Sequence, residues 1–304
     1  MPDCHICGVR SIELVVSNLD EAARFYEDIW GLKPVATARN DSRYFRGTSR
    51  YHHVLGLHQG VQPAVVCIVF DVADRAGVDA LQERIAAAGG RPGTPAKLTT
   101  AGGGYGFACK DPDGRNLAFV AEAADHADSA DIADRPRKIV HVNLNARDFE
   151  ASLSFFTQTL SFRVVDDNAP LTFLHCASTD HCAIVLCKMN LPTLNHIAFE
   201  MPEFDSVMRG MGRMKDAGYP IEWGPGRHGP GNNIFAYFCG PDEVPLEYAA
   251  EVLQIDDGYT PHSSDYWKFK PGRSDQWGIT QPRSARYYRV QRLFGFTADG
   301  DRLS

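Results

Sequence analysis

The pattern of apolar and polar residues along the chain occurs twice. The segment VRSIELVVSNLDEAARFYEDIWGLKPV, which begins at Val9, has an alternating strand pattern, a short polar turn, apolar residues at helical spacing and a second strand. The segment IVHVNLNARDFEASLSFFTQTLSFRVV, which begins at Ile139, repeats this order. Further along, PAVVCIVFDVAD matches PTLNHIAFEMPEF, and KDPDGRNLAFVAEA matches CGPDEVPLEYAAEV, at a nearly constant offset. A constant offset over more than a hundred residues indicates two copies of one domain.

Each copy divides again into two similar units. Residues 139–187 predict a strand, a helix and three strands, and residues 194–251 predict the same order, with Gly218 ending the helix. We therefore predict an α+β fold of four βαβββ modules, which pair into two similar domains. Each domain is expected to be a curved mixed sheet that forms a cup.

The repeat also gives the domain boundaries. We expect an N-terminal domain at 1–122, a linker rich in Ala and Asp at 123–137 and a C-terminal domain at 138–252. The tail, 253–304, contains too many aromatic residues for a free linker, so we expect it to pack on a domain or on a neighbouring subunit.

Composition and charge narrow the function. The chain has 304 residues, 44% hydrophobic and 23% charged, which is ordinary for a globular protein of two domains. Its formal charge is -7 and it has no basic run, which argues against a nucleic-acid partner. The sequence has no apolar run of membrane-spanning length and no signal-peptide pattern, so we expect no membrane partner and a cytoplasmic location. The eight cysteines are accordingly expected to be reduced.

The two copies differ at three positions that carry chemistry. The second copy has His141, His196 and Glu247 where the first has a serine, a cysteine and an alanine. A lone strand histidine is most often a buried structural residue. Three such replacements in predicted strands, where every second side chain points to the same face, instead suggest side chains that converge in one cavity. Two imidazoles and one carboxylate are the ligand set of non-haem Fe(II) oxygenases, although these ligands also suit Mn(II), Zn(II) or Ni(II).

These features together resemble the vicinal oxygen chelate superfamily, and within it the two-domain type I extradiol catechol dioxygenases, such as 2,3-dihydroxybiphenyl 1,2-dioxygenase. The resemblance covers residues 8–252 and includes the DPDG-like turn before the last strand of each domain. It implies a metal site in the C-terminal domain only, with Fe(II), or alternatively Mn(II), held by His141, His196 and Glu247. It further implies a catechol-type substrate, O2 as co-substrate, ring cleavage beside the diol and a homo-oligomer.

Three more residues match this subfamily by spacing. His181 precedes His196 by 15 positions, and His228 and Tyr237 precede Glu247 by 19 and 10 positions. The resemblance assigns His181 as the acid and base, which accepts the catechol proton and returns it during O–O cleavage. It assigns His228 and Tyr237 as hydrogen-bonding partners of the bound oxygen atoms. Taken singly, His181 would be interpreted as a turn histidine and Tyr237 as a core aromatic.

One departure from the subfamily concerns the segment after His228. Relatives of the dihydroxybiphenyl type often have an aspartate there, whereas this chain has GPGNN at 229–233. We therefore expect Asn232 or Asn233 to supply a different polar contact.

Two other functions fit the same superfamily. A glyoxalase-like isomerase or lyase would use Zn or Ni with a fourth protein ligand, often a Glu on the strand that corresponds to CAIVLCK, which has no carboxylate. A non-catalytic binding protein would have no need for the metal-ligand residues together with His181. The histidines in YHHVLGLHQG (His52, His53 and His58) are interpreted as structural, because no carboxylate accompanies them in that strand and hairpin.

Overall fold

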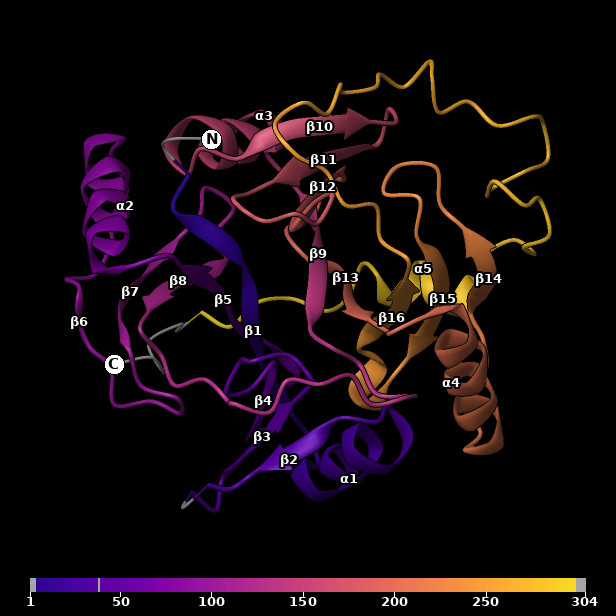
Figure 1. Ribbon diagram of the computed structural model, residues 1–304, viewed down its shortest axis with the longest axis horizontal. Helices are drawn as coiled ribbons and strands as arrows, with labels where there is room; N and C mark the ends of the chain where they lie inside the picture. Colours follow the sequence, from indigo (N-terminus) through magenta and orange to yellow (C-terminus); the bar gives the residue numbers. More distant parts are fainter. Residues whose placement is uncertain (1–3, 38, 299–304) are drawn as a thin grey trace.

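The computed structural model describes residues 4–37 and 39–298, which fold into two eight-stranded mixed sheets (Figure 1). The N-terminal sheet has the strand order β2 (Lys33–Val35), β3 (Ser42–Arg46), β4 (Leu55–Gln59), β1 (Ile6–Val16), β5 (Ala64–Val72), β8 (Asn116–Ala121), β7 (Tyr105–Lys110), β6 (Ala96–Lys97). The C-terminal sheet has the order β10 (Arg163–Asp167), β11 (Leu171–His175), β12 (Ile184–Lys188), β9 (Ile139–Ala146), β13 (Leu194–Glu200), β16 (Pro245–Ala250), β15 (Ile234–Cys239), β14 (Trp223–Arg227).

The two strand orders are the same when the repeat is superimposed, and this confirms the predicted fold of four βαβββ modules in two cup-shaped domains. Each module contributes one helix: α1 (Leu19–Arg24), α2 (Arg75–Ala87), α3 (Phe149–Ser154) and α4 (Phe204–Asp216). Helices α1 and α3 each continue into a π-helical turn, Phe25–Ile29 and Phe155–Thr159, and a 3₁₀ turn lies at Pro241–Glu243.

Local sequence explains where the helices begin and end. The side chains of Asn18 and Asp148, at equivalent positions of the repeat, accept hydrogen bonds from the backbone N–H groups three residues later and cap α1 and α3. Asp74 caps α2 in the same way. Gly218 follows α4 with a φ of +85°, a left-handed conformation that favours glycine, as expected for a helix stop.

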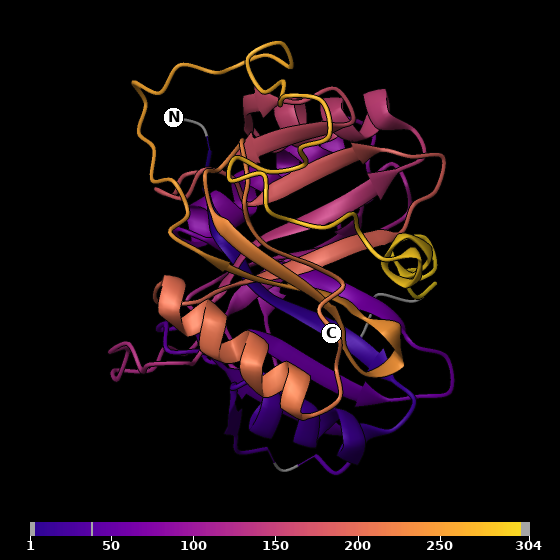
Figure 2. The same ribbon diagram turned by 90° about the vertical axis from the view of Figure 1, so that its right-hand side faces the viewer.

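Helices and buried polar groups join the two domains. Helix α4 packs against β15 and β16 of its own domain (Figure 2) and also contacts the π-helical turn Phe25–Ile29 of the N-terminal domain. The Trp30 ring stacks on Tyr248 with centroids 3.8 Å apart, and the Tyr248 hydroxyl donates to the Trp30 carbonyl. Arg115 is fully buried, pairs with Asp111 at 2.6 Å, and donates from Nη1 to the main-chain oxygen of Asn145 at 2.8 Å. A buried guanidinium with paired donors fixes how the domains meet.

The tail packs on both domains of its own chain. It contains helix α5 (Ala285–Val290), which contacts β15 (Figure 1). Further along, Leu194 N–H donates to the Phe294 carbonyl, and Thr297 N–H donates to the Val65 carbonyl of the N-terminal domain. Within the described residues, no helix is both long and apolar enough to span a membrane. All eight cysteines are free thiols.

Candidate metal centre

Three neighbouring strands of the C-terminal sheet bring the predicted ligands together. Ala198, at the centre of β13, pairs with His141 of β9 on one side and with Glu247 of β16 on the other. His196 lies two residues before Ala198, so its side chain points to the same face of the sheet. The strand register therefore places two imidazoles and one carboxylate at the same point of the C-terminal cup.

The three ligand-type atoms are within contact distance of one another. The Nε2 atoms of His141 and His196 lie 3.2 Å apart, and Glu247 Oε2 lies 3.4 Å from the first and 3.0 Å from the second. Three atoms bound to one ion at roughly 2.1 Å and at right angles would be about 3.0 Å apart, so this spacing fits a shared divalent ion. Within the described part of the chain, no other group of three His, Cys, Asp or Glu ligand atoms lies within 4.8 Å of one another.

Hydrogen bonds leave the inward atoms of this group available. The His196 Nδ1–H donates to Asn195 Oδ1 at 2.9 Å, which leaves a lone pair on Nε2. Asn233 Nδ2 donates to Glu247 Oε1 at 3.1 Å, whereas Glu247 Oε2 is buried and receives no well-directed hydrogen bond. A buried carboxylate oxygen without a donor is costly, and a metal ion would satisfy it.

Electrostatics set the charge states of Glu247 and His196. Burial alone would raise the pKa of Glu247, but the neighbouring His141, His196 and His228 lower it well below its usual value, so Glu247 is ionised. Burial lowers the pKa of His196 to about 4, against the opposing effect of Glu247, so His196 is neutral at pH 7. A neutral imidazole and an ionised carboxylate are the forms that bind a divalent cation.

His228 and Tyr237 lie beside the candidate ligands, as their spacing suggested. Tyr237 pairs with Glu247 across β15 and β16, and its hydroxyl is 2.8 Å from His228 Nε2. His228 Nε2 is also 3.6 Å from Glu247 Oε1. Burial raises the pKa of Tyr237 well above its usual value, so the phenol keeps its proton, and burial lowers the pKa of His228. Both groups are therefore neutral hydrogen-bonding groups at the wall of the cup.

The His181 side chain hydrogen-bonds the carboxylate of Asp166, a partner that the sequence did not indicate. Its Nε2 lies 2.6 Å from Asp166 Oδ2, and both side chains are fully buried. Its Nδ1 is buried without a partner and lies 3.4 Å from the point where a Cβ on Gly231 would be. Asn233 Oδ1 lies 3.3 Å from the same point. The His181 ring therefore turns Nδ1, and not Nε2, toward the segment that contains Asn233, which hydrogen-bonds Glu247.

The tail supplies further donors to this carboxylate. The Tyr259 hydroxyl donates to Asp166 Oδ2 at 3.1 Å, and the His262 backbone N–H donates to Asp166 Oδ1 at 2.9 Å. Burial alone would raise the pKa of Asp166, but the hydrogen bond from His181 and these donors lower it, so Asp166 stays ionised. No local pattern in VVDD distinguishes Asp166 from an ordinary strand residue, because its role depends on His181 in the loop before β12 and on the tail.

The segment 229–233, which differs from the subfamily pattern, contributes one contact to the candidate metal site. Of its two asparagines, Asn233 holds Glu247, as described above, whereas Asn232 Oδ1 accepts a hydrogen bond from Gln276 of the tail at 3.0 Å. Asn195, which orients His196, was also missed by the sequence analysis, because adjacent strand residues normally point to opposite faces.

The N-terminal cup contains a different histidine cluster. Glu13 of β1 accepts from His53 Nε2 at 3.0 Å through Oε1 and from His58 Nε2 at 2.8 Å through Oε2. The carboxylate missing from the histidine-rich hairpin thus comes from another strand. Ser42 Oγ bonds His58 Nδ1 at 3.0 Å, and His52 Nδ1 bonds His53 Nδ1 at 2.9 Å. Each of these ring nitrogens and carboxylate oxygens has a partner, which agrees with a structural role.

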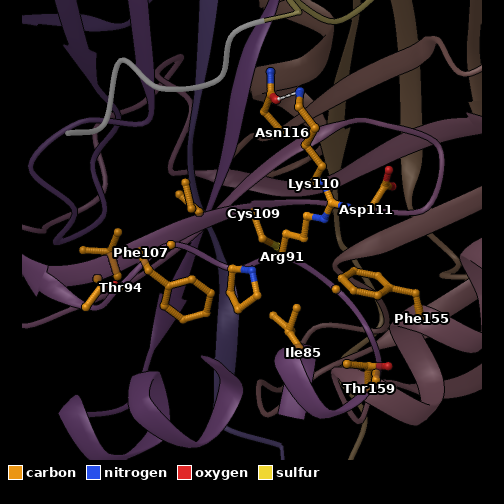
Figure 3. A pocket seen from close by; sticks show the side chains of 18 of the residues that line it. Ile85, Arg91, Thr94, Phe107, Cys109, Lys110, Asp111, Asn116, Phe155 and Thr159 are labelled. Atoms are coloured by element: carbon orange, nitrogen blue, oxygen red, sulfur yellow. Dashed lines mark hydrogen bonds between the residues drawn. The ribbon is translucent and has the colours of Figure 1, made fainter. Parts of the chain in front are cut away.

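A large cleft elsewhere in the molecule does not coincide with this chemistry. A cleft of about 1220 Å³ lies between α2, β7 and the π-helical turn after α3 (Figure 3). Its walls include Ile85, Phe107 and Phe155, and none of the six predicted site residues lines it. The convergence of ligand atoms, rather than cavity size, therefore locates the candidate site.

Comparisons with known proteins agree with this architecture. The model of the Glyoxalase/Bleomycin resistance protein/Dioxygenase superfamily matches residues 8–119 and 138–248. The structure of the Mn(II)-bound glyoxalase from Novosphingobium aromaticivorans is similar, with a TM-score of 0.85 and 33% identity over 93% of this chain and 94% of that chain. A variant of homoprotocatechuate 2,3-dioxygenase from Brevibacterium fuscum has a TM-score of 0.83 over 94% of this chain and 82% of that chain; at 24% identity this likeness concerns the fold.

One curated relative matches part of the chain. Metapyrocatechase 2 from Cupriavidus necator is 30% identical over 133 residues, which are 43% of this chain. The matched region spans 42% of the length of that relative, less than half of it.

Proposed function

The chain belongs to the Glyoxalase/Bleomycin resistance protein/Dioxygenase superfamily, and from this premise we propose that it is an extradiol catechol dioxygenase. It would insert both atoms of O2 into a substituted catechol and open the ring beside the diol. The observation that carries the proposal is the group of three ligand atoms from His141, His196 and Glu247, with no fourth carboxylate on β12. Three protein ligands leave room for two substrates at one ion.

We propose Fe(II) as the resident ion, with Mn(II) as the alternative. Such an ion, held by His141, His196 and Glu247, would supply Lewis acidity and one-electron redox chemistry to a catechol and O2. Glu247 provides the negative charge that retains a divalent cation, and Asn233 orients this carboxylate. His196 would bind through Nε2, because its Nδ1 is already engaged by Asn195, and His141 would bind through Nε2, the atom that faces the other two ligands.

His181 is proposed as the proton acceptor and donor. Asp166 accepts the Nε2–H, so Nδ1 carries the lone pair and can accept a proton from a catechol hydroxyl. The ionised Asp166 then stabilises the imidazolium that forms, and this favours both the uptake and the return of the proton.

His228 and Tyr237 are proposed to bind the substrate oxygens. Tyr237 keeps its proton and can donate to a developing oxyanion, while His228 holds the phenol in place at 2.8 Å. Both lie next to the buried Glu247, where little water competes for hydrogen bonds, and donors act more strongly in such surroundings.

A glyoxalase-like isomerase is the second candidate. The Mn(II)-bound glyoxalase is 33% identical over nearly the whole chain, and this favours metal chemistry without O2. The open ligand set and the His181–Asp166 pair favour the dioxygenase. The cytoplasmic location and the homo-oligomer remain predictions.

The decisive experiment begins with anaerobic purification and measurement of the bound metal. The Fe(II)-reconstituted protein is then given a panel of substituted catechols, with O2 uptake and the yellow ring-opened product as readouts. We expect about one ion per chain and stoichiometric O2 consumption. Conversion of a glutathione hemithioacetal, without O2 uptake on any catechol, would contradict the proposal and support the isomerase.

A further inference from the structure

We infer that Asn195 is a positioning residue for the metal ligand His196, and that the C-terminal tail fixes the direction of the Asn195 amide. The inference rests on the proposed function, because it concerns the readiness of the site to bind metal. On this inference, the tail influences the metal site through hydrogen bonds to residues that contact neither the substrate nor the ion.

The direction of the hydrogen bonds follows from one main-chain atom. The carbonyl oxygen of Gln291, just after α5, can only accept, and Asn145 Nδ2 donates to it at 2.6 Å. The other end of that amide, Asn145 Oδ1, must then face Asn195, whose Nδ2 donates to it at 2.9 Å. Asn195 Oδ1 is thereby left facing His196 Nδ1, 2.9 Å away.

Two additional contacts agree with the same orientation. The Gln291 side chain donates from Nε2 to Asn195 Oδ1 at 2.5 Å, so this oxygen accepts from two sides. Thr193 Oγ1 accepts from Asn145 Nδ2 at 2.8 Å and reaches the Gln291 carbonyl at 3.2 Å. All members are buried, so water cannot replace a lost partner at low cost, and reversal of either amide would place donors or acceptors against each other.

A strand irregularity makes the last link geometrically feasible. Neighbouring residues of a regular strand point to opposite faces and do not bond to each other. The pairing of β13 with β9 shifts register between Leu194 and His196, and Asn195 lies in this bulge. Its side chain can therefore turn back to the imidazole of the next residue.

The consequence concerns the tautomer of His196. An oxygen facing Nδ1 requires a hydrogen there, and the neutral ring then has its lone pair on Nε2, directed at the other two ligands. If the Asn195 amide were reversed, its NH2 would face Nδ1, and the ring proton would move to Nε2, where the ion has to bind. The tail thus selects the metal-binding tautomer before the metal arrives.

The first test measures Mn(II) affinity of the full chain by the EPR signal of the free ion. Asn195→Leu removes the acceptor at similar size and should weaken Mn(II) binding about 10–100-fold. Asn195→Asp retains an acceptor oxygen for Nδ1 but sets its second oxygen against Asn145 Oδ1, so it should weaken binding clearly less than Asn195→Leu. Gln291→Met, which removes one of the two donors to Asn195, should give a smaller loss than Asn195→Leu. Arg289→Met changes an exposed residue of α5 and serves as the matched control.

The second test reads the tautomer without metal. The ¹⁵N spectrum of the histidine-labelled, metal-free protein should show His196 with its proton on Nδ1 in the wild type and in Asn195→Asp, and with a substantial Nε2–H population in Asn195→Leu. Equal losses in the Asp and Leu variants, or an Nε2–H wild type, would overturn the inference while the proposed function stands. A wild-type protein that binds neither Mn(II) nor Fe(II) would overturn the proposed function and the inference together.

Discussion

Replacement of Asp166 by asparagine should lower kcat strongly and leave metal binding intact. The carboxylate has two oxygens with different partners: Oδ1 accepts the backbone N–H of His262 at 2.9 Å, and Oδ2 accepts His181 Nε2–H at 2.6 Å. A backbone N–H always donates, so in Asp166→Asn the amide oxygen must occupy the Oδ1 position. The amide NH2 then faces His181 Nε2.

This substitution exchanges the donor and acceptor nitrogens of the His181 imidazole. His181 Nε2 becomes an acceptor, the ring proton moves to Nδ1, and the atom proposed to accept the catechol proton loses its lone pair. General acid–base catalysis contributes typically 10²–10⁴-fold, and a wrong histidine tautomer costs about 10⁴-fold in serine proteases. We therefore expect kcat to fall by about 10²–10⁴-fold, at unchanged metal occupancy.

The assay is O2 uptake by the Fe(II)-loaded enzyme at saturating catechol, together with iron content and thermal unfolding. Asp167→Asn is the matched control, because the Asp167 carboxylate accepts from the Ala169 N–H and the Thr172 hydroxyl of its own hairpin and not from His181. His181→Ala should lose kcat to a similar degree, and the double variant should be no worse than either single one, since both changes remove the same proton acceptor. An Asp166→Asn enzyme within twofold of wild type would refute the assigned tautomer and role.

Three further outcomes are expected. Glu247→Gln keeps the size but removes the negative charge of the site, so metal content should drop from about one ion per chain to near zero, and full occupancy by elemental analysis would disprove the ligand assignment. Burial alone would raise the pKa of Glu13, but hydrogen bonds from its two histidines lower it to about 2. The ionised Glu13 therefore stabilises the folded protein by about 3 kcal/mol as an upper estimate. This contribution is present above pH ~4.5 and is lost as the pH falls toward ~2. The difference in urea unfolding free energy between wild type and Glu13→Gln should therefore shrink from pH 6 to pH 3, and a constant difference would argue against this origin. Gly231→Ala places a Cβ at a φ of +76° and 3.3 Å from Asn233 Oδ1, so it should destabilise the protein by about 1–2 kcal/mol and reduce turnover with little loss of metal.

The fold could be predicted from the sequence because its information is periodic and duplicated. Apolar residues at strand and helix spacing identified the modules, and the constant offset identified the domains. The candidate ligands could be predicted for a related reason: an internal copy shows what each position contains when only folding constrains it. His141, His196 and Glu247 differ from their counterparts, and the strand register brings them within 3.4 Å of one another.

The supporting residues could not be predicted, because their roles arise from contacts between distant segments. Asp166 of β10 bonds His181 in the loop before β12 and also contacts the tail, and Asn195 depends on a bulge that no local pattern indicates. Glu13 stands in the ordinary strand pattern SIELVV, and its partners come from a hairpin about 40 residues later in the sequence. Propensity and alternation describe one segment at a time, whereas these contacts are tertiary.

The two cups show why chemistry is expected in only one of them. In the N-terminal cup, the oxygens of Glu13 and the ring nitrogens of His53 and His58 are all paired within the protein, so this network stabilises the fold and has no valence left for a ligand. In the C-terminal cup, Glu247 Oε2 and His181 Nδ1 are buried without hydrogen-bond partners. Each such atom costs about 1–3 kcal/mol, and in this cup a bound metal ion and a substrate would complete both. A duplicated domain allows this division, because the saturated copy contributes stability that the copy with the open valences lacks.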